Sequence, residues 1–241
     1  MITLSNVSYA YEGNTALCGI DIDIPRGSSV AFLGPNGSGK STLLKLLNGI
    51  VLPDAGRYSF DGELVTRDAL RSQAFARRFH QRIGFLFQSS EEQLFCPSVK
   101  EEVAFGPRQM GLDEREVADR TNDCLKLLDI ACLAQRSPWH LSEGEKRKVA
   151  FASVLALNPE VLTLDEPLNG LDPRTKRFLR ELVVSLRGAG KTILCAAHDF
   201  RYLEGVFSDA VVFSADHRIV RAGGFEEIVA DRGFLEANNL L

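Results

Sequence analysis

The sequence predicts an α/β protein whose mainly parallel β-sheet is covered by helices. Three observations predict this class: short apolar strands alternate with helical segments, an alternating strand pattern opens the chain, and a largely helical stretch interrupts it. We therefore expect a single domain over residues 1–241. It would comprise an antiparallel β-subdomain that starts with residues 1–27, a core of residues 28–96 and 141–241, and an inserted helical subdomain at about residues 97–140.

The opening strands are predicted by residues 20–24, where isoleucine alternates with aspartate before Pro25. Ile2, Leu4 and Val7 indicate a partner strand, so the chain should begin with an antiparallel pair. Residues 28–33 then form a short apolar strand, which is followed by a glycine-rich turn and by a helix with leucines at helical spacing. This order of strand, loop and helix is the one that a phosphate-binding unit requires.

The later elements repeat the alternation of strand and helix. One helix should begin near Ser142 and end before Pro159, and another has Asp172 as N-cap, Pro173 at its first position and Gly188 just past its end. The region from residue 97 to 139 is mainly helical, and a short helical tail ends the chain. The remaining strands are short and apolar, at residues 83–87, 161–165, 192–196 and, as a hairpin, 211–220.

The composition is close to the average for soluble globular proteins, with 45% hydrophobic and 25% charged residues. The net charge of −4 argues against a protein that mainly binds nucleic acid, because phosphate contacts need an excess of Lys and Arg. The five cysteines are widely spaced, as in cytosolic proteins with reduced thiols. No secretory signal or spanning apolar run is visible, so any membrane role would need another chain.

Residues 34–42 match the phosphate-loop pattern G-x-x-x-x-G-K-[ST]. The glycines let the backbone curl so that N–H groups point inward, and the next helix adds the positive end of its dipole. Lys40 can reach the β- and γ-phosphates, and Ser41 can place its hydroxyl on Mg²⁺. The residues expected to bind the phosphates are Gly34, Pro35, Asn36, Gly37, Ser38, Gly39, Lys40, Ser41 and Thr42.

Two carboxylates, Asp165 and Glu166, end the apolar strand at residues 161–165. Asp165 is placed to hold Mg²⁺, and Glu166 can polarise an attacking water, a role that typically contributes about 10²–10⁴ in rate. Such a strand can also be purely structural, and a phosphate loop alone does not separate kinases, GTPases and ATPases. Residues 170–172, Gly-Leu-Asp, and His198, 32 residues beyond Glu166, favour the catalytic interpretation.

Taken in order, these motifs resemble those of the ATP-binding cassette (ABC) ATPases over nearly the whole chain. The motifs are residues 34–42, Gln88, residues 141–145, residues 161–166, residues 169–172 and His198. The resemblance implies an ATPase with ATP and Mg²⁺ as cofactors. It also implies a P-loop NTPase core with the antiparallel β-subdomain and the inserted helical subdomain of an ABC ATPase.

The resemblance assigns roles to single residues. Tyr11 would stack on adenine, with Tyr9 as a rival. Gln88 would sense the γ-phosphate and touch a membrane subunit, Glu166 would be the general base, and His198 would hold the γ-phosphate. The residues implied to be catalytic are therefore Lys40, Gln88, Glu166 and His198, and those implied to hold Mg²⁺ are Ser41, Gln88 and Asp165.

Residues 141–145 correspond to the signature segment of the family, in which Ser142 and Gly144 would cap the ATP bound to the opposite subunit of a head-to-tail dimer. The segment departs from the usual Leu-Ser-Gly-Gly-Gln, because Glu143 and Glu145 replace the first glycine and the glutamine. Acidic groups suit a helix N-terminus but add negative charge near a triphosphate. The basic residues 146–148 follow at once and can offset that charge.

A finer resemblance lies between Gln88 and Arg120, where residues 93–95, 103–107 and 110–112 are similar to the cobalt and nickel branch of the energy-coupling-factor importers. The vitamin-importing branch is an alternative. The implied location is the cytoplasmic face of the cell membrane. The implied partners are a second ATPase subunit, identical or related, an integral membrane transport subunit and a substrate-specific membrane component, with no nucleic acid.

Two other functions are open to such a sequence. One is an ABC ATPase that acts on the ribosome or on chromosomal DNA, although such proteins usually carry two cassettes or a long coiled-coil insert. The other is a small-molecule kinase, which would leave the signature segment and His198 without a role. The arginines between Arg71 and Arg82 form a basic stretch that is typical of the solvated face of a short amphipathic helix.

Overall fold

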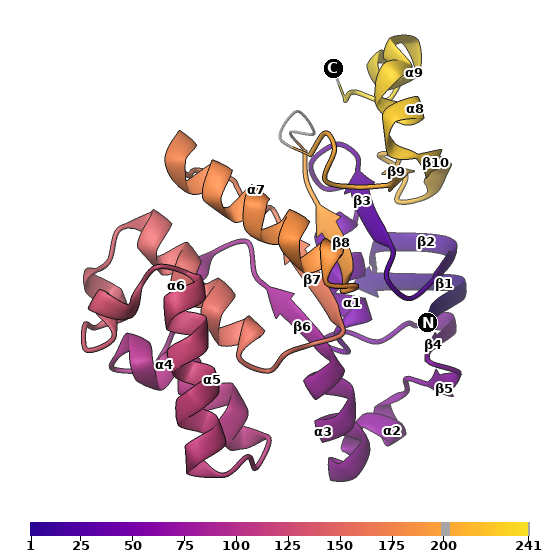
Figure 1. Ribbon diagram of the computed structural model, residues 1–241. Coiled ribbons are helices and arrows are strands. Elements are labelled where there is room, and N and C mark those ends of the chain that lie inside the picture. Colours follow the sequence, from indigo (N-terminus) through magenta and orange to yellow (C-terminus); the bar gives the residue numbers. More distant parts are fainter. Residues whose placement is uncertain (199–202, 241) are drawn as a thin grey trace.

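Two β-sheets form the centre of the molecule in the computed structural model, which describes residues 1–198 and 203–240 (Figure 1). The first sheet is antiparallel with strand order β2-β1-β4-β5. Its strands are β1 (Ile2–Tyr11), β2 (Asn14–Ile24), β4 (Ala55–Phe60) and β5 (Glu63–Leu64). In the β1–β2 pair Ile2 lies opposite Ile24 and Leu4 opposite Ile22, so the alternating apolar positions share one face, as predicted.

The first sheet also includes strands from residues 55–64, a segment that the sequence predicts to belong to the core. β4 pairs with β1, with Tyr58 opposite Leu4 and Phe60 opposite Ile2. Both aromatic side chains are buried, and the Tyr58 hydroxyl donates to the carbonyl of Leu47 at 2.7 Å. The two aromatic residues alternate with polar ones, and this pattern is too short to show its sheet partner in the sequence. The exact limits of the three subdomains therefore stay a prediction.

The second sheet has the order β10-β9-β3-β8-β7-β6 and is parallel except for the β9–β10 pair. Its strands are β3 (Ser29–Leu33), β6 (Ile83–Leu86), β7 (Val161–Asp165), β8 (Thr192–Ala196), β9 (Asp209–Phe213) and β10 (Ile219–Gly224). The strands β3, β6, β7 and β8 are buried along their whole length, which explains their continuous apolar sequences. The predicted α/β class with a mainly parallel sheet is confirmed.

Helices cover the second sheet and join it to the first. Helix α1 (Lys40–Leu47) buries four leucines in a core that contains residues of both sheets. Helix α7 (Pro173–Gly188) has Asp172 as its N-cap and Pro173 at its first position, as predicted. Its end differs, because Gly188 is the last helical residue and Gly190 takes the left-handed conformation, with φ of 82°. Helices α8 (Phe225–Ala230) and α9 (Arg232–Ala237) follow β10.

The helical stretch forms a lobe that lies away from the antiparallel sheet (Figure 1). It contains α4 (Val99–Gln109), α5 (Glu114–Leu127) and two 3₁₀ turns (Ala131–Leu133 and Pro138–His140). Helices α4 and α5 both contact α6 (Glu143–Leu155). Helix α6 also packs on β6, so it connects the lobe to the parallel sheet. The basic stretch starts at Arg71, the last residue of α2 (Arg67–Arg71), and continues through α3 (Gln73–Arg82). Phe79 is the one buried residue of α3.

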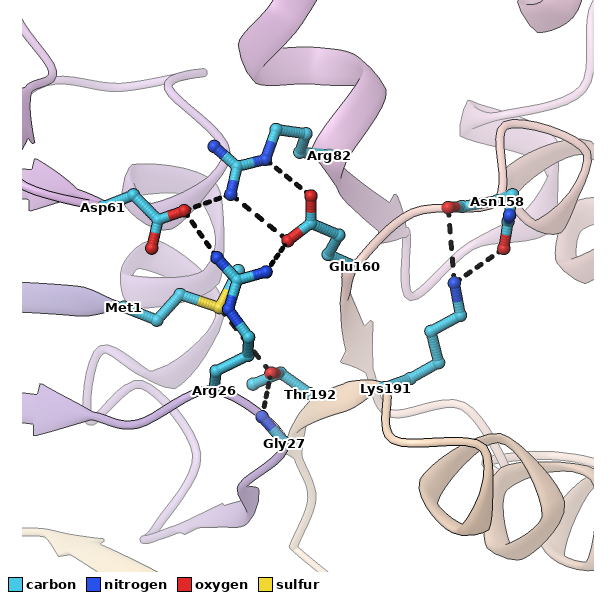
Figure 2. Close-up of polar contacts among 9 residues, drawn as sticks. All are labelled: Met1, Arg26, Gly27, Asp61, Arg82, Asn158, Glu160, Lys191 and Thr192. Carbon is cyan, nitrogen blue, oxygen red and sulfur yellow. Dashed lines mark hydrogen bonds and ion pairs between the residues drawn. The ribbon is translucent and has the colours of Figure 1, made fainter.

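A network of four charged side chains joins the two sheets at the amino ends of the parallel strands (Figure 2). Arg26 precedes β3 and pairs with Asp61 at 2.7 Å, while Arg82 precedes β6 and pairs with Glu160 at 2.7 Å. Arg26 also pairs with Glu160, and Arg82 with Asp61. The hydrogen bond from Arg82 lowers the pKa of Glu160, which keeps its carboxylate charged. The network therefore joins the two sheets at the amino ends of the parallel strands, and the phosphate loop lies at their carboxyl ends.

No helix in the described ranges, 1–198 and 203–240, is long and apolar enough to cross a membrane.

Candidate active site

The phosphate loop leaves the carboxyl end of β3 and runs into α1. Gly37 and Gly39 take positive φ angles of 80° and 106°. A Cβ atom at Gly39 would lie 2.2 Å from the carbonyl oxygen of Ala16, so no larger residue fits there. The first turn of α1 carries no acidic residue and no side-chain cap, and its N–H groups and dipole are therefore available to an anion.

Lys40 is held inside this loop. Its Nζ donates to the carbonyl oxygens of Gly34 at 2.7 Å and Pro35 at 2.9 Å. Burial lowers the pKa of Lys40, and the negative charges of Glu166 and Asp165 partly oppose that shift. The ammonium group is thus fixed by the loop itself, beside the two carboxylates at the end of β7.

Asp165 ends β7 and is joined to the phosphate loop. The Ser41 hydroxyl donates to Asp165 Oδ1 at 2.9 Å. Burial raises the pKa of Asp165, the hydrogen bond from Ser41 opposes the shift, and the charge of Glu166 adds to it. A hydroxyl and a carboxylate at hydrogen-bond distance are hard oxygen donors of the kind that Mg²⁺ prefers, so this pair fits the ion.

Glu166 and His198 follow adjacent parallel strands, β7 and β8. Glu166 Oε2 lies 2.9 Å from His198 Nδ1. The Glu166 backbone has a φ of 46°, which is unusual for a residue other than glycine, and its N–H donates to the Ala196 carbonyl at 2.9 Å. Strained backbone of this kind is concentrated at functional sites. The strand ends therefore hold the two side chains together at the carboxyl edge of the sheet.

One pocket of about 590 Å³ brings most of the predicted nucleotide-binding residues together. The predicted residues that line it are Tyr11, Asn36, Gly37, Gly39, Lys40, Ser41, Thr42, Gln88, Glu166 and His198. Tyr9 does not line it, although its ring lies edge-on to that of Tyr11 with centroids 4.8 Å apart. Asp165 reaches the pocket through Ser41. The pocket thus brings together the ring of Tyr11, the N–H groups of the phosphate loop and the Glu166 carboxylate.

A family model described as ABC transporter matches residues 17–169, which is more than half of the chain. The chain belongs to the ABC transporter ATPase family. A protein of Clostridium acetobutylicum is 54% identical over the full length of both chains and carries a provisional name as an ABC transporter ATP-binding protein, without a stated substrate. The nickel import ATP-binding protein LarO of Lactiplantibacillus plantarum is 46% identical, with 91% of each chain covered.

Two solved structures share the fold of this ABC ATPase. CbiO1 from Clostridium perfringens, described as part of the ABC transporter complex cbiONQ, has a TM-score of 0.83 and 35% identity, and the match covers 99% of this chain and 94% of that one. A dimeric ATP-binding cassette, MJ0796 with ADP and Pi bound, has a TM-score of 0.82 and 26% identity, with 93% and 98% covered. The predicted ABC ATPase fold is confirmed.

Ser142 and Gly144 of the ABC ATPase lie elsewhere. They line a second pocket of about 440 Å³ together with Lys148, Asp172 and Thr175, and the two pockets share no residue. Ser142 caps α6, and Glu145 takes part in a capping box: the Ser142 backbone N–H donates to Glu145 Oε2 at 2.9 Å. A single subunit therefore does not bring the signature segment to its own phosphate loop.

Five residues of the nucleotide pocket are not among those predicted from the sequence. They are Asn14, Thr15, Ala16, Asn169 and His217. His217 stands in the β9–β10 turn, where its carbonyl accepts a hydrogen bond from the Cys18 N–H at 2.9 Å. These residues reach the pocket through tertiary contacts and share no sequence motif. Only Asn169 stands inside a recognised motif and was within reach of sequence reasoning.

Proposed function

We propose that this ABC ATPase is the ATP-hydrolysing subunit of an energy-coupling-factor type importer, and that it powers uptake of a divalent metal ion, nickel or cobalt, through a separate membrane subunit. The observation that carries the ATPase role is the single pocket in which Tyr11, the phosphate loop and the Glu166–His198 pair meet. The metal substrate is supported by the similarity to a nickel import protein.

Each side chain of the pocket has a role in this proposal. The adenine stacks on Tyr11, and the loop N–H groups and Lys40 bind the phosphates. Ser41, Asp165 and Gln88 would hold Mg²⁺, which supplies positive charge to the β- and γ-phosphate oxygens. Glu166 accepts the proton of the attacking water, and His198 binds the γ-phosphate while its Nδ1 orients Glu166. Fixed donors around the developing charge supply the remaining stabilisation.

Two subunits are needed for a complete site in this proposal. Ser142 and Gly144 of one copy would contact the ATP in the first pocket of the other, since within one chain they line a separate pocket. The dimeric form of the similar MJ0796 cassette supports this arrangement. ATP shifts the population towards the closed dimer if it binds the closed form more tightly than the open form. Hydrolysis of the ATP then allows the dimer to reopen. We place the dimer at the cytoplasmic face of the membrane.

Uptake of radiolabelled nickel and cobalt by cells that carry the intact complex tests this proposal. Cells in which only this subunit is replaced by the Lys40→Ala variant should lose uptake, with the membrane partners present at equal amounts. Excess unlabelled nickel or cobalt should compete, and vitamins should not. If vitamin uptake depends on Lys40 and metal uptake does not, the vitamin-importing branch is the correct one. Co-sedimentation with ribosomes or DNA, and none with membranes, would contradict both.

A further inference from the structure

Arg147 is a buried arginine on the second turn of α6, and only 5% of it is exposed. Its Nη1 donates to the Phe87 carbonyl at 2.7 Å, and its Nη2 donates to the Gln88 carbonyl. Among the described residues it has no ion pair with a carboxylate, and its buried Nε has no hydrogen-bond partner. A buried charge with so few partners is costly to the fold, so stability alone does not account for it.

Further contacts attach the segment of residues 87–93 to the same helix. The Gln93 side chain donates to the Ala150 carbonyl at 3.1 Å and accepts from the Phe87 N–H at 3.2 Å. Lys146 Nζ pairs with Glu91 at 2.7 Å. The polar segment that follows β6 is therefore bonded to α6 at several successive points, and Arg147 is the point at Gln88 itself.

The two ends of this connection belong to different pockets. Gln88 lines the pocket of the phosphate loop. Ser142 and Gly144, at the N-terminus of α6, line the second pocket. A displacement of the Gln88 main chain towards or away from a γ-phosphate must move the Arg147 guanidinium or break its hydrogen bond to the Gln88 carbonyl. Arg147 lies only three residues beyond Gly144.

We infer that Arg147 couples the two ATP sites of the dimer, because it fixes the Gln88 backbone to the helix whose first turn contacts the opposite nucleotide. Arg147 is a positioning residue: it touches neither nucleotide and acts through Gln88 on one side and the start of α6 on the other. This inference rests on the proposed head-to-tail dimer. It adds the residue that transmits the state of one pocket to the other.

The test compares three single variants of the purified full chain with the wild type. Arg147→Met keeps most of the side-chain volume and removes the charge and both hydrogen bonds, and Arg147→Lys keeps the charge. The matched control is Arg120→Met, because Arg120 also bonds a backbone carbonyl at α6, that of its C-cap residue Ala156 at 3.4 Å, but at the other end of the helix. Trp139, the single tryptophan, is exposed and stands three residues before Ser142, so its fluorescence reports on the start of α6.

Four quantities are measured: the Kd for ATP at protein concentrations that keep the subunit monomeric, the ATP concentration for half-maximal dimerisation, the Hill coefficient of hydrolysis, and the ATP-induced change in Trp139 emission. Arg147→Met should leave the Kd of the monomer close to wild type. It should raise the ATP concentration for dimerisation by about tenfold, a common size for coupling between sites, and lower the Hill coefficient towards one. The ATP-induced change in Trp139 emission should shrink with it. Arg147→Lys should be intermediate, and Arg120→Met should match the wild type.

Wild-type dimerisation and cooperativity in Arg147→Met would overturn the inference. An equal loss in Arg120→Met would also overturn it, because a general loosening of the helical lobe would then explain both. If Arg147→Met does not fold, Arg147→Lys provides the test. A loss of cooperativity in that variant at unchanged Tm supports the coupling, and cooperativity equal to that of the wild type contradicts it. A wild-type protein that neither dimerises nor hydrolyses ATP would refute the proposed function instead, so the two failures are distinguishable.

Discussion

At the scale of single residues, two tyrosines stand close together near the end of β1, and only one of them lines the pocket. Tyr11 is 41% exposed and lines the nucleotide pocket, whereas Tyr9 is partly buried and supports the ring of Tyr11 edge-on. An exposed aromatic ring at the mouth of a pocket can stack on a base, because every base has an apolar π-face. The geometry favours Tyr11 over Tyr9 as the adenine contact.

Replacing Tyr11 by alanine should therefore weaken ATP binding by about tenfold, since stacking of a base on an aromatic ring contributes about 1–3 kcal/mol. Tyr11→Phe should bind like the wild type, and Tyr9→Ala should lose less than Tyr11→Ala. Calorimetric titration with ATP measures the change. Titration with inorganic triphosphate is the control, because it lacks the base and should bind all three variants equally. If Tyr11→Ala lost as much affinity for triphosphate as for ATP, Tyr11 would stabilise the phosphate loop and would not contact the base.

Six of the nine residues predicted for the phosphate loop line the pocket, and Gly34, Pro35 and Ser38 do not. The loop could be predicted because its motif lies within nine consecutive positions. Asp165 and Glu166 could be predicted because they end an apolar strand, and His198 because of its place in the series of motifs that resembles the ABC ATPases. Ala16 could not, since its role comes from the close approach of its carbonyl to Gly39, which only the folded chain shows. Arg147 stands in a basic run of the sequence, and nothing in that run indicates that the side chain is buried against Gln88.

At the scale of elements, helix α6 combines three tasks: it packs on β6, binds the Gln88 segment and presents Ser142 and Gly144. Its N-terminus is closed by the capping box of Ser142 and Glu145. Hydrogen bonds from Ser142 lower the pKa of Glu145, so the carboxylate stays charged at neutral pH. Glu145 therefore stabilises the helix start while it places a negative charge in the pocket proposed to face a triphosphate.

These two effects of Glu145 can be separated by substitution. Glu145→Gln keeps a capping side chain and removes the charge, so the free energy of unfolding should stay close to wild type while ATP-driven dimerisation strengthens. Glu145→Ala removes both, and it should lower the free energy of unfolding by about 1 kcal/mol. Denaturant unfolding measures the first quantity and light scattering at increasing ATP the second. Weaker dimerisation of Glu145→Gln would show that the carboxylate itself makes a needed contact.

Most elements could be predicted because their apolar spacing is strong and their caps are explicit, as at Asp172 and Pro173 in α7. The placement of β4 in the antiparallel sheet could not be predicted from so short an alternation. The end of α7 was placed one residue early, because two glycines, Gly188 and Gly190, stand there and only Gly190 takes the positive φ. Local patterns thus specify the type of an element better than its partners or its last residue.

At the scale of the whole molecule, the described residues form two separate pockets, which are the two half-sites of the proposed dimer. The phosphate loop and the strand-end carboxylates form one pocket, the start of α6 lines another, and a second copy would be needed to join them. The four-residue ion network at the opposite edge of the sheet joins the antiparallel and parallel sheets, and these partly exposed pairs should weaken with added salt. Sequence patterns predicted the fold class, but only the folded chain shows that the two pockets are separate.

The most direct test of this account is ATP hydrolysis by Glu166→Gln, measured beside MgATP binding and dimerisation on the same preparation. Glutamine keeps the size of the side chain and cannot accept the proton of the attacking water. We predict that the variant binds MgATP and accumulates as a dimer, while its hydrolysis rate falls by about 10²-fold or more. Hydrolysis at the wild-type rate in a folded, ATP-binding Glu166→Gln protein would contradict the account.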